Sequence, residues 1–177
     1  MRLHAWVAAS LLAFAASGSE PGPVDAKAEV YFSPGSGCSE AIVRELGEAK
    51  QSVLVQAYSF ASLPIAQAMV DAHKRGVKVY VILDKSQRTE PESSADFLAN
   101  AGLHVKVDAK HHKAHNKVII IDDEVVLTGS FNFNSTAAEQ NADNLVVLRG
   151  KELAARYVEN WKEHYVHSKK YRGGEQE

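Results

Sequence analysis

The sequence has little cysteine, no excess of charge of one sign and no hydrophobic run long enough to cross a bilayer. Cys38 is the only cysteine in 177 residues, which excludes an intrachain disulfide framework and a multi-cysteine zinc site. The net charge of -2 gives no overall attraction to nucleic acid or to an anionic membrane, so any attraction to phosphate has to come from local clusters. An apolar content of 45% in a chain of this length suffices for one domain with a single packed core.

Residues 5–16 form an uninterrupted run of apolar and small residues after a short basic start. The run has about 12 residues, against the roughly 20 that a membrane-spanning helix needs. Small residues at its end offer several cleavage registers. We expect a signal peptide at 1–17, cleaved between about 15 and 26, no stable membrane span, and a secreted or periplasmic bacterial protein. An uncleaved anchor is the alternative.

Apolar periodicity predicts an α/β domain over 28–166. A flexible lead-in rich in proline and glycine, 18–27, precedes it, and a polar tail, 167–177, follows and is expected to be frayed from Ser168. The turn at 122–124 joins two strands directly, so that hairpin is antiparallel. The predicted fold is an α/β/α sandwich with a mixed β-sheet flanked by helices. Expected strands are 29–32, 52–59, 77–83, 104–107, 118–121, 125–128 and 144–148; expected helices are 39–50, 64–74, 95–100 and 151–164.

The densest group of polar side chains lies at the open end of this hairpin. His115 and Lys117 are two residues apart, so in an extended segment both side chains leave the same face. The second strand returns to that point at Gly129, where Ser130 and Asn132 are again two residues apart. An imidazole, an ammonium, a hydroxyl and an amide are therefore predicted to converge on one spot.

This set of groups suits a phosphodiester. Because the pKa of a histidine side chain is about 6.5, His115 can attack phosphorus or protonate a leaving oxygen at neutral pH. Lys117 and Asn132 would contact the non-bridging oxygens, where negative charge builds in the transition state. Gly129 would let the backbone approach the ligand. No cluster of carboxylates is present to hold magnesium, so we expect chemistry without a metal ion or another cofactor.

The hairpin residues also carry a resemblance. The pattern His115-x-Lys117-x4-Asp122-x6-Gly129-Ser130-x-Asn132 resembles the HKD signature of the phospholipase D superfamily. Residues 28–165 resemble the short bacterial endonuclease branch of that superfamily, on the strand 29–32 with its Pro-Gly turn, on 56–60 and on 73–77. The resemblance implies a two-step mechanism in which one histidine attacks phosphorus and a second protonates the leaving oxygen. Because the chain carries one copy of the signature, it also implies a homodimer that shares one active site.

The resemblance further implies a carboxylate before the last core strand that orients the histidine. The family usually has glutamate there, whereas this chain has Asp143, with Glu139 as the alternative. Asp122 belongs to the signature, but we expect it to be structural and to bond the backbone of its turn or a neighbouring segment. Gln56 and Ser59 are candidates for lining the pocket, because they lie near a strand end. The catalytic set is then His115, Lys117, Asp122, Ser130, Asn132 and Asp143, and the substrate-binding set is Lys117, Asn132, Gly129, Gln56 and Ser59.

A second interpretation treats His111, His112 and His115 as a zinc cluster, although no cysteine accompanies them and no helix spaces them four apart. We expect instead that residues 110–113 form a basic rim that guides an anionic substrate toward Lys117. A merely solvated loop is the alternative to that rim.

Three functions compete. The leading one is a nuclease that cleaves DNA or RNA with little sequence preference; the second is a phospholipase D acting on phosphatidyl head groups; the third is an inactive binding module. The short chain, with no amphipathic membrane-docking stretch, favours nucleic acid. Tyr58 and Phe131 are expected to be core aromatics rather than base-stacking platforms.

Overall fold

The structure, a computed structural model, describes residues 22–173, and the predicted signal peptide lies outside the described residues. The described strands are β1 (Lys27–Phe32), β2 (Ser52–Ala57), β3 (Lys78–Asp84), β4 (His104–Asp108), β5 (Lys117–Ile121), β6 (Val125–Gly129), β7 (Asn144–Arg149) and β8 (Lys169–Lys170). The helices are α1 (Cys38–Glu48), α2 (Leu63–Lys74), α3 (Ala95–Asn100), α4 (Ser135–Glu139) and α5 (Lys151–His167), with a 3-10 turn η1 (Lys85–Arg88).

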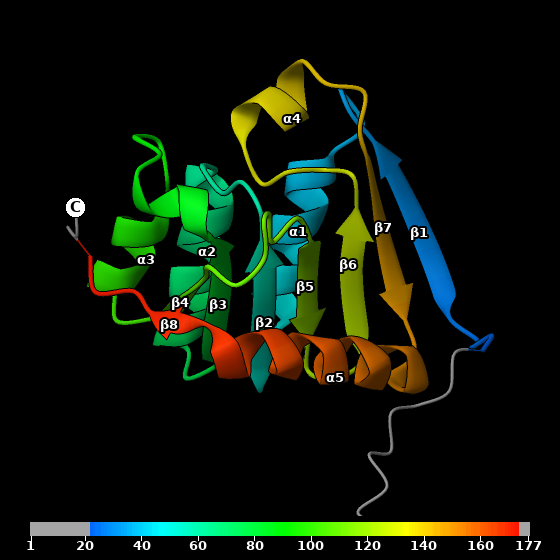
Figure 1. The fold of residues 1–177 in the computed structure, drawn as a ribbon. Helices are drawn as coiled ribbons and strands as arrows, with labels where there is room; N and C mark the ends of the chain where they lie inside the picture. Colours follow the sequence, from blue (N-terminus) through cyan, green and yellow to red (C-terminus); the bar gives the residue numbers. More distant parts are fainter. Residues whose placement is uncertain (1–21, 174–177) are drawn as a thin grey trace, which may run out of the picture.

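One sheet with the order β1-β7-β6-β5-β2-β3-β4-β8 forms the centre of the molecule (Figure 1). β2, β3 and β4 are parallel neighbours, and the other pairs are antiparallel, including the hairpin of β5 and β6. Helix crossovers join the parallel strands, as parallel pairing requires. The predicted mixed sheet is confirmed.

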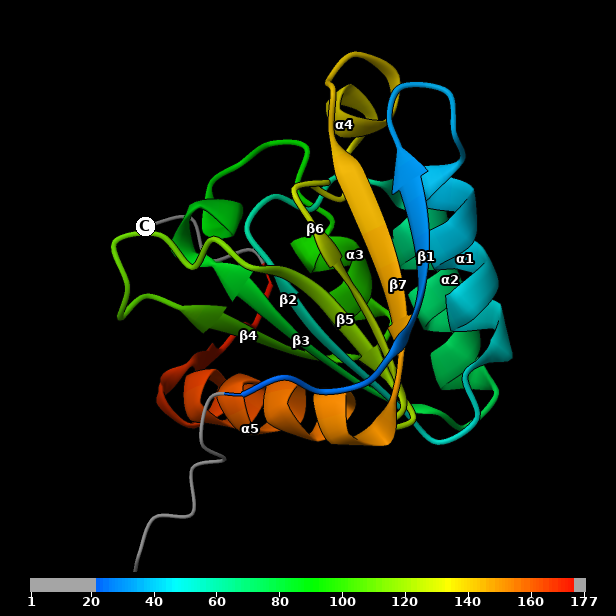
Figure 2. The ribbon, with the colours of Figure 1, turned by 90° about the vertical axis from the view of Figure 1, so that its right-hand side faces the viewer.

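Helices cover both faces of the sheet. α5 crosses one face, while α1 and α2 pack on the other, so the molecule has three layers (Figures 1 and 2). Successive side chains along each strand point to opposite faces of the sheet, so each strand contributes to the cores on both sides. On β5, Ile119 and Ile121 enter the larger core under α1 and α2, whereas Ile120 packs with α5. Trp161 fixes α5 to the sheet by donating from Nε1 to the carbonyl of Val55 at 2.9 Å.

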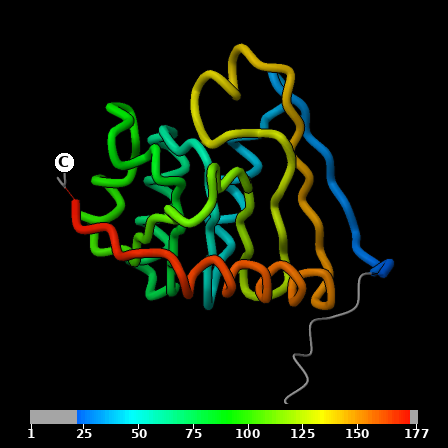
Figure 3. Tube along the Cα trace, viewed as in Figure 1, coloured from blue at the N-terminus to red at the C-terminus, as the bar shows by residue number. Residues whose placement is uncertain are grey.

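The strand ends that carry the candidate residues lie together at one end of the central strands. The register pairs Ala57, the last residue of β2, with Lys117, the first residue of β5. It also pairs Gly129, the last residue of β6, with Leu145 near the start of β7. These strand ends are at the top of the trace in Figure 3. The fold therefore brings segments from four strands to the place where the sequence predicted the site.

The prediction of a frayed tail from Ser168 is wrong for residues 168–173. β8 pairs antiparallel with β4, and the backbone N–H of Tyr171 donates to the carbonyl of Val105 at 2.9 Å. The Tyr171 side chain is buried, and its hydroxyl donates to Asp96 at 2.8 Å. The physical reason is that β4 would otherwise leave unpaired backbone groups along its edge. A single aromatic residue between Lys170 and Arg172 gives too weak a pattern to indicate this strand.

α4 was also not expected. It is five residues long, too short for a helical period to be visible in the sequence. Its signal is the cap: the side-chain oxygen of Asn134 accepts a hydrogen bond from the backbone N–H of Ala137 at 2.8 Å.

Replacing Tyr171 by Ala is expected to lower the free energy of unfolding by about 3 kcal/mol, because a buried aromatic ring and its hydrogen bond are lost together. Denaturation in urea measures the change. The matched control is Lys169→Ala, which alters an exposed side chain two residues away and should stay within about 0.5 kcal/mol of the parent. Equal stability of the two variants would show that the tail is not part of the folded domain.

Candidate active site

His115 and Lys117 reach the site because the loop before β5 is fixed at its end. The carboxylate of Asp84, the last residue of β3, accepts a hydrogen bond from the backbone N–H of Ala114 at 2.7 Å. Asp84 is 2% exposed, and its other oxygen accepts from the N–H of Ser86, so the carboxylate cannot turn away. The sequence interpretation missed Asp84; the available signal was an acidic residue directly after a buried apolar strand.

The ammonium of Lys117 lies against the ring of His115. Lys117 Nζ is 3.1 Å from Nδ1 and 3.3 Å from Nε2 of His115, and it donates to the His115 carbonyl at 2.8 Å. Because an ammonium has only donors and carries a positive charge, its position against the ring favours an unprotonated ring nitrogen. His115 itself is exposed, whereas Lys117 is 7% exposed. The arrangement therefore presents a neutral imidazole to solvent above a buried positive charge.

The electrostatics agree with this geometry. Partial desolvation by the neighbouring side chains lowers the pKa of His115 although its ring is exposed, and the positive charges of Lys117 and Lys113 lower it further, while Asp84 acts in the opposite direction. Burial also lowers the pKa of Lys117, against which the charge of Asp143 works. At neutral pH the imidazole of His115 is consequently available as a nucleophile or base.

Tyr58, expected to be a core aromatic, belongs to the site. Its ring centroid lies 4.4 Å from that of His115, and Lys117 Nζ lies 5.1 Å from the Tyr58 centroid. Its backbone N–H donates to the carbonyl of Asn116, which extends the pairing of β2 with β5 by one step. Tyr58 therefore forms one wall beside the histidine. The other aromatic, Phe131, is a core residue as predicted.

The second half of the site follows β6, and Gly129 makes its turn possible. Gly129 has φ 146, and a Cβ on it would lie 2.2 Å from the carbonyl oxygen of Asn144. That carbonyl accepts from the N–H groups of both Ser130 and Phe131. The close approach predicted for Gly129 is thus made to the backbone of β7, and a contact of Gly129 with substrate stays a prediction.

Ser130 and Asp143 are joined directly. Ser130 Oγ donates to Asp143 Oδ1 at 2.7 Å and accepts from the N–H of Asn144 at 3.1 Å. The other carboxylate oxygen of Asp143 is buried and receives no hydrogen bond from the described residues. Asp143 is therefore held in place by Ser130, while its charge stays available to Lys117, as the pKa of that lysine reflects.

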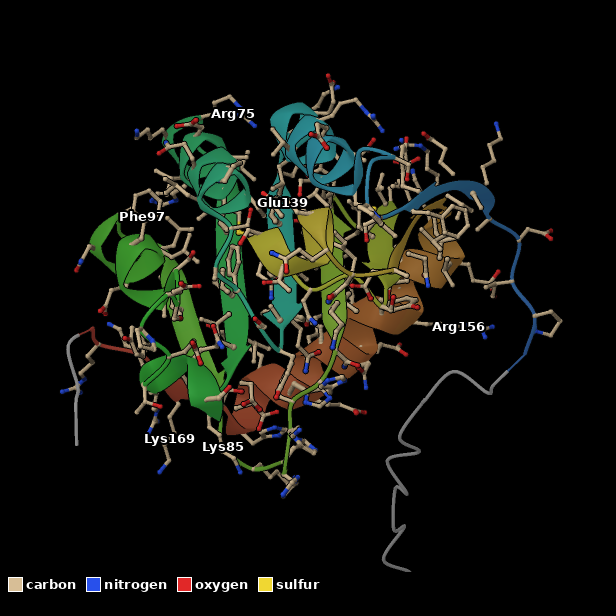
Figure 4. The ribbon with its side chains drawn as sticks, turned by 90° about the horizontal axis from the view of Figure 1, so that it is seen from above. Arg75, Lys85, Phe97, Glu139, Arg156 and Lys169 are labelled. Carbon is tan, nitrogen blue, oxygen red and sulfur yellow. The ribbon has the colours of Figure 1, made fainter. Side chains whose placement is uncertain are left out.

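Glu139, the alternative to Asp143, lies elsewhere. It is exposed on α4, above the sheet edge in the view of Figure 4. There it lines a cleft of about 540 Å³ together with Ser62, Leu63 and Asn134. Of the two carboxylates, only Asp143 is joined to another residue of the predicted catalytic set.

Asn132 and Ser59 lie on the neighbouring segment. Asn132 is half-buried, and its Oδ1 is a buried acceptor without a donor among the described residues. Ser59 Oγ accepts from Asn134 Nδ2 at 2.9 Å, and its carbonyl accepts from the N–H of Phe133. Ser59 therefore supports the Asn132 segment, and direct contact of Ser59 with substrate stays a prediction.

Gln56 is not brought to Lys117. Its neighbours Val55 and Ala57 face the core under α1 and α2, so by strand alternation its side chain lies on the α5 face. There its Oε1 accepts from Asn116 Nδ2 at 3.1 Å. Lys117 has the same parity as Ile119 and lies on the opposite face. The pocket-lining role predicted for Gln56 is corrected to a bond across the strand pair.

Asp122 is likewise not brought to the catalytic group. It lies at the opposite end of β5 from Lys117, roughly 16 Å along the strand at about 3.3 Å per residue. Its carboxylate accepts from the backbone N–H groups of Lys50, Gln51 and Ser52 at 2.7–2.9 Å. The catalytic listing of Asp122 is therefore corrected, and of the two structural roles expected for it, the bond to a neighbouring segment is the one found.

The alternative zinc cluster of His111, His112 and His115 is not formed. The His115 ring contacts Lys117 and Tyr58, His112 is exposed, and the His111 ring turns to Asp108, with Nδ1 2.9 Å from Oδ2. Lys113 Nζ lies 5.6 Å from the Tyr58 ring centroid, so part of the predicted basic rim does border the site.

The sequence profile of the family described as cardiolipin synthase, PLD-like domain, matches residues 42–165. The chain belongs to the phospholipase D superfamily. It is 39% identical over 135 residues to a protein named phospholipase D from Rickettsia conorii, which covers 76% of this chain and 68% of that one.

Solved structures agree with the family and with the fold. Nuc from Salmonella typhimurium, a phospholipase D family member, superposes with a TM-score of 0.80 at 34% identity and covers 84% of this chain and 100% of its own. NucT from Helicobacter pylori gives 0.76 at 23% identity, covering 83% and 100%. The chain is thus a phosphodiester hydrolase of this superfamily, with the fold that the sequence predicted.

Asp122→Asn tests the corrected role of that carboxylate. Burial alone would raise the pKa of Asp122, but the three backbone donors outweigh it and lower the pKa. The stabilisation is therefore present above the pKa of an unfolded aspartate, near about 3.9, and is lost as pH falls through the lower folded value. The variant should lose about 2 kcal/mol of unfolding free energy at pH 7, measured in urea.

A catalytic role predicts a different result. If Asp122 takes part in chemistry, Asp122→Asn will lower turnover at 20 °C, well below unfolding, by far more than it lowers the folded fraction. Asp123→Asn, in the same turn but exposed, is the matched control for both measurements.

Proposed function

We propose that the protein is a metal-independent endonuclease that hydrolyses DNA or RNA phosphodiester bonds through a phosphohistidine at His115. The observation that carries the proposal is the pair of His115 and Lys117: a neutral, exposed imidazole in contact with a buried ammonium. The imidazole supplies the nucleophile, and the ammonium offers a positive charge to the phosphoryl oxygens. No step of this chemistry needs a Lewis acid.

The reaction has two displacements. In the first, a ring nitrogen of His115 attacks phosphorus, and the bond from phosphorus to the leaving oxygen breaks. A second histidine, which enters this step protonated on both ring nitrogens, gives one of these protons to that oxygen. In the second, this second histidine takes a proton from water, the water oxygen attacks phosphorus, and the phosphorus–nitrogen bond breaks. Both histidines return to their starting states, and the product is a phosphomonoester.

The second histidine is proposed to come from another copy of the chain. Within residues 22–173 no other histidine contacts His115 or Lys117 through a hydrogen bond or ring contact. A two-fold axis beside the exposed His115 would place two imidazoles on opposite sides of one phosphorus. The functional unit is therefore a homodimer that shares one active site.

Nucleic acid is the favoured substrate because positive charge gathers beside the histidine. Lys110, His112 and Lys113 are exposed on the loop that leads to His115, and Lys85 donates to the carbonyl of His111 in the same loop. A local cluster of this kind attracts a polyanion although the whole chain is slightly acidic. The basic rim predicted from the sequence thus supports the sugar–phosphate backbone of a nucleic acid as ligand.

Phospholipid is the second candidate, and specific observations favour it. The Rickettsia conorii relative carries the name phospholipase D. Leu63 is 62% exposed and lines the same cleft as Glu139, and Phe32, 60% exposed, ends β1 just before the lining residue Ser33. Two exposed apolar side chains would contact acyl chains at a membrane surface. None of the helices in residues 22–173 is both long and apolar enough to span a bilayer.

The proposal includes export. The run at 5–16 is the basis, and it lies outside the described residues, so the enzyme is proposed to act in the periplasm or outside a bacterial cell after removal of residues 1–17 or a slightly longer segment.

One assay separates the candidate substrates. Purified protein is offered single-stranded DNA, RNA and phosphatidylcholine vesicles in excess EDTA at 20 °C, with release of new phosphomonoester ends or of choline as the readout. DNA or RNA should be cleaved, and His115→Ala should lower turnover by at least ~10²-fold. Choline release without nucleic-acid cleavage would establish the lipid candidate instead, and full activity of His115→Ala would remove His115 from the mechanism.

Sedimentation tests the shared site. The mature protein should sediment as a dimer at the concentrations at which it is active. Ser130→Ala, which keeps the exposed surface almost unchanged, is a control for dimer formation that is independent of His115. A monomer with full turnover would contradict the need for a second copy.

A further inference from the structure

Four side chains from two distant parts of the chain converge on the side of the molecule where β4 ends. Asp108, the last residue of β4, is fully buried, and its Oδ2 is 2.9 Å from His111 Nδ1. The same oxygen is 3.0 Å from His164 Nδ1 and 3.0 Å from His167 Nε2. All four ligand-type atoms lie within 4.8 Å of one another.

The backbone fixes both halves of this cluster. Asp108 and His111 are three residues apart at the start of the loop, and Asp108 Oδ1 accepts from the N–H of Lys110 at 2.9 Å, which sets the direction of Oδ2. His164 and His167 are three apart on the last turn of α5, so both project from one face. The carbonyl of His164 accepts from Ser168 Oγ at 2.7 Å, which holds the helix end. Figure 2 shows the loop after β4 on the same side as the end of α5.

Hydrogen bonding alone accounts poorly for the arrangement. A carboxylate oxygen offers about two lone-pair sites, yet three imidazole nitrogens point at Asp108 Oδ2. The three rings are also crowded, with centroids 4.9–5.4 Å apart. Three imidazole nitrogens gathered within 4.8 Å of one another and of a buried carboxylate oxygen form a donor set suited to a bound cation.

We infer that Asp108, His111, His164 and His167 bind one zinc ion. Imidazole nitrogen and carboxylate oxygen are ordinary zinc ligands, and four of them make a closed tetrahedral site. With metal–ligand distances of about 2.0–2.1 Å, ligand atoms at neighbouring corners lie about 3.3 Å apart. The three distances to Asp108 Oδ2 are within 0.4 Å of that edge, at 2.9–3.0 Å.

The ligand types select the class of metal. Calcium and magnesium prefer six or more oxygen ligands, and this cluster offers one carboxylate and three nitrogens. The absence of a thiolate argues against copper(I) and iron–sulfur chemistry. The backbone N–H of Lys110 bonds the second oxygen of Asp108 and so orients that carboxylate, as outer contacts do at metal sites.

The site would tie α5 to the loop that carries the active-site histidine. His111 is four residues before His115, and α5 is the layer that covers the other face of the sheet. The ion is structural, because all four positions are filled by protein and the His115 ring lies instead on Tyr58 and Lys117. Asp84 holds the end of the same loop independently, so turnover at 20 °C should survive chelation.

The test uses the untagged mature protein, stripped with EDTA and dialysed, with zinc or cobalt(II) as the only added metal. Titration followed by elemental analysis should give one zinc per chain. The melting temperature should rise by roughly 5–10 °C at a free zinc concentration about a hundred times Kd. Cobalt(II) should give the visible absorption bands of a tetrahedral site, which a hydrogen-bonded histidine cluster would not produce.

Variants locate the ion. His164→Asn and His167→Asn should each weaken zinc binding by at least ~10-fold and abolish the tetrahedral cobalt spectrum, with circular dichroism confirming that they fold. His112→Asn, an exposed histidine of the same loop, and His115→Ala should bind as the parent does. The cobalt spectrum of the parent provides a result even if a variant fails to fold.

Three outcomes would overturn the inference: no zinc bound by the parent, no tetrahedral cobalt spectrum, or parent-like binding by His164→Asn. Loss of zinc from His115→Ala would also overturn it, since the ion would then belong to the active site.

Discussion

Lys117 holds its ammonium against the imidazole of His115 with only 7% of the lysine exposed to solvent. Removing an ammonium from water costs roughly several kcal/mol, so the site has to compensate it. The carbonyl of His115 accepts from it, and the charge of Asp143 acts on it from the far side of the site. The rest of the structure supports this one contact. The contact places a neutral imidazole and a positive charge within a few ångströms of each other.

The fold provides that support by bringing the ends of β2 and β6 and the starts of β5 and β7 to the same end of the sheet. β2 ends opposite the start of β5, the turn at Gly129 reaches the backbone of Asn144, and Asp84 holds the residue before His115. Asp122 serves the same purpose from the other end of β5, where it bonds the backbone that leads into β2. The signature residues are thus divided between the two ends of β5, with His115 and Lys117 at one end and Asp122 at the other.

The sequence predicted the parts of this arrangement that have local signals. Apolar runs indicated the strands. The two-residue spacings of His115 with Lys117 and of Ser130 with Asn132 indicated that these side chains converge at one end of the hairpin. It did not predict what depends on contacts between distant segments. Asp108 and His164 are 56 residues apart and meet only because α5 crosses the sheet, and β8 exists because an edge of β4 needs a partner. Tyr58 and Gln56 were assigned to the wrong environments because a strand end gives little indication of which face a side chain takes.

The central claim is that His115 is a nucleophile in half of an active site. The most direct measurement is to mix the enzyme with a short oligonucleotide, stop the reaction in neutral denaturant and locate the covalent adduct by mass spectrometry. The account predicts a phosphorus–nitrogen adduct on His115 and on about half of the chains, because one of the two histidines attacks while the other transfers the proton. An adduct on another residue, or on His115 in every chain of an active sample, would contradict it.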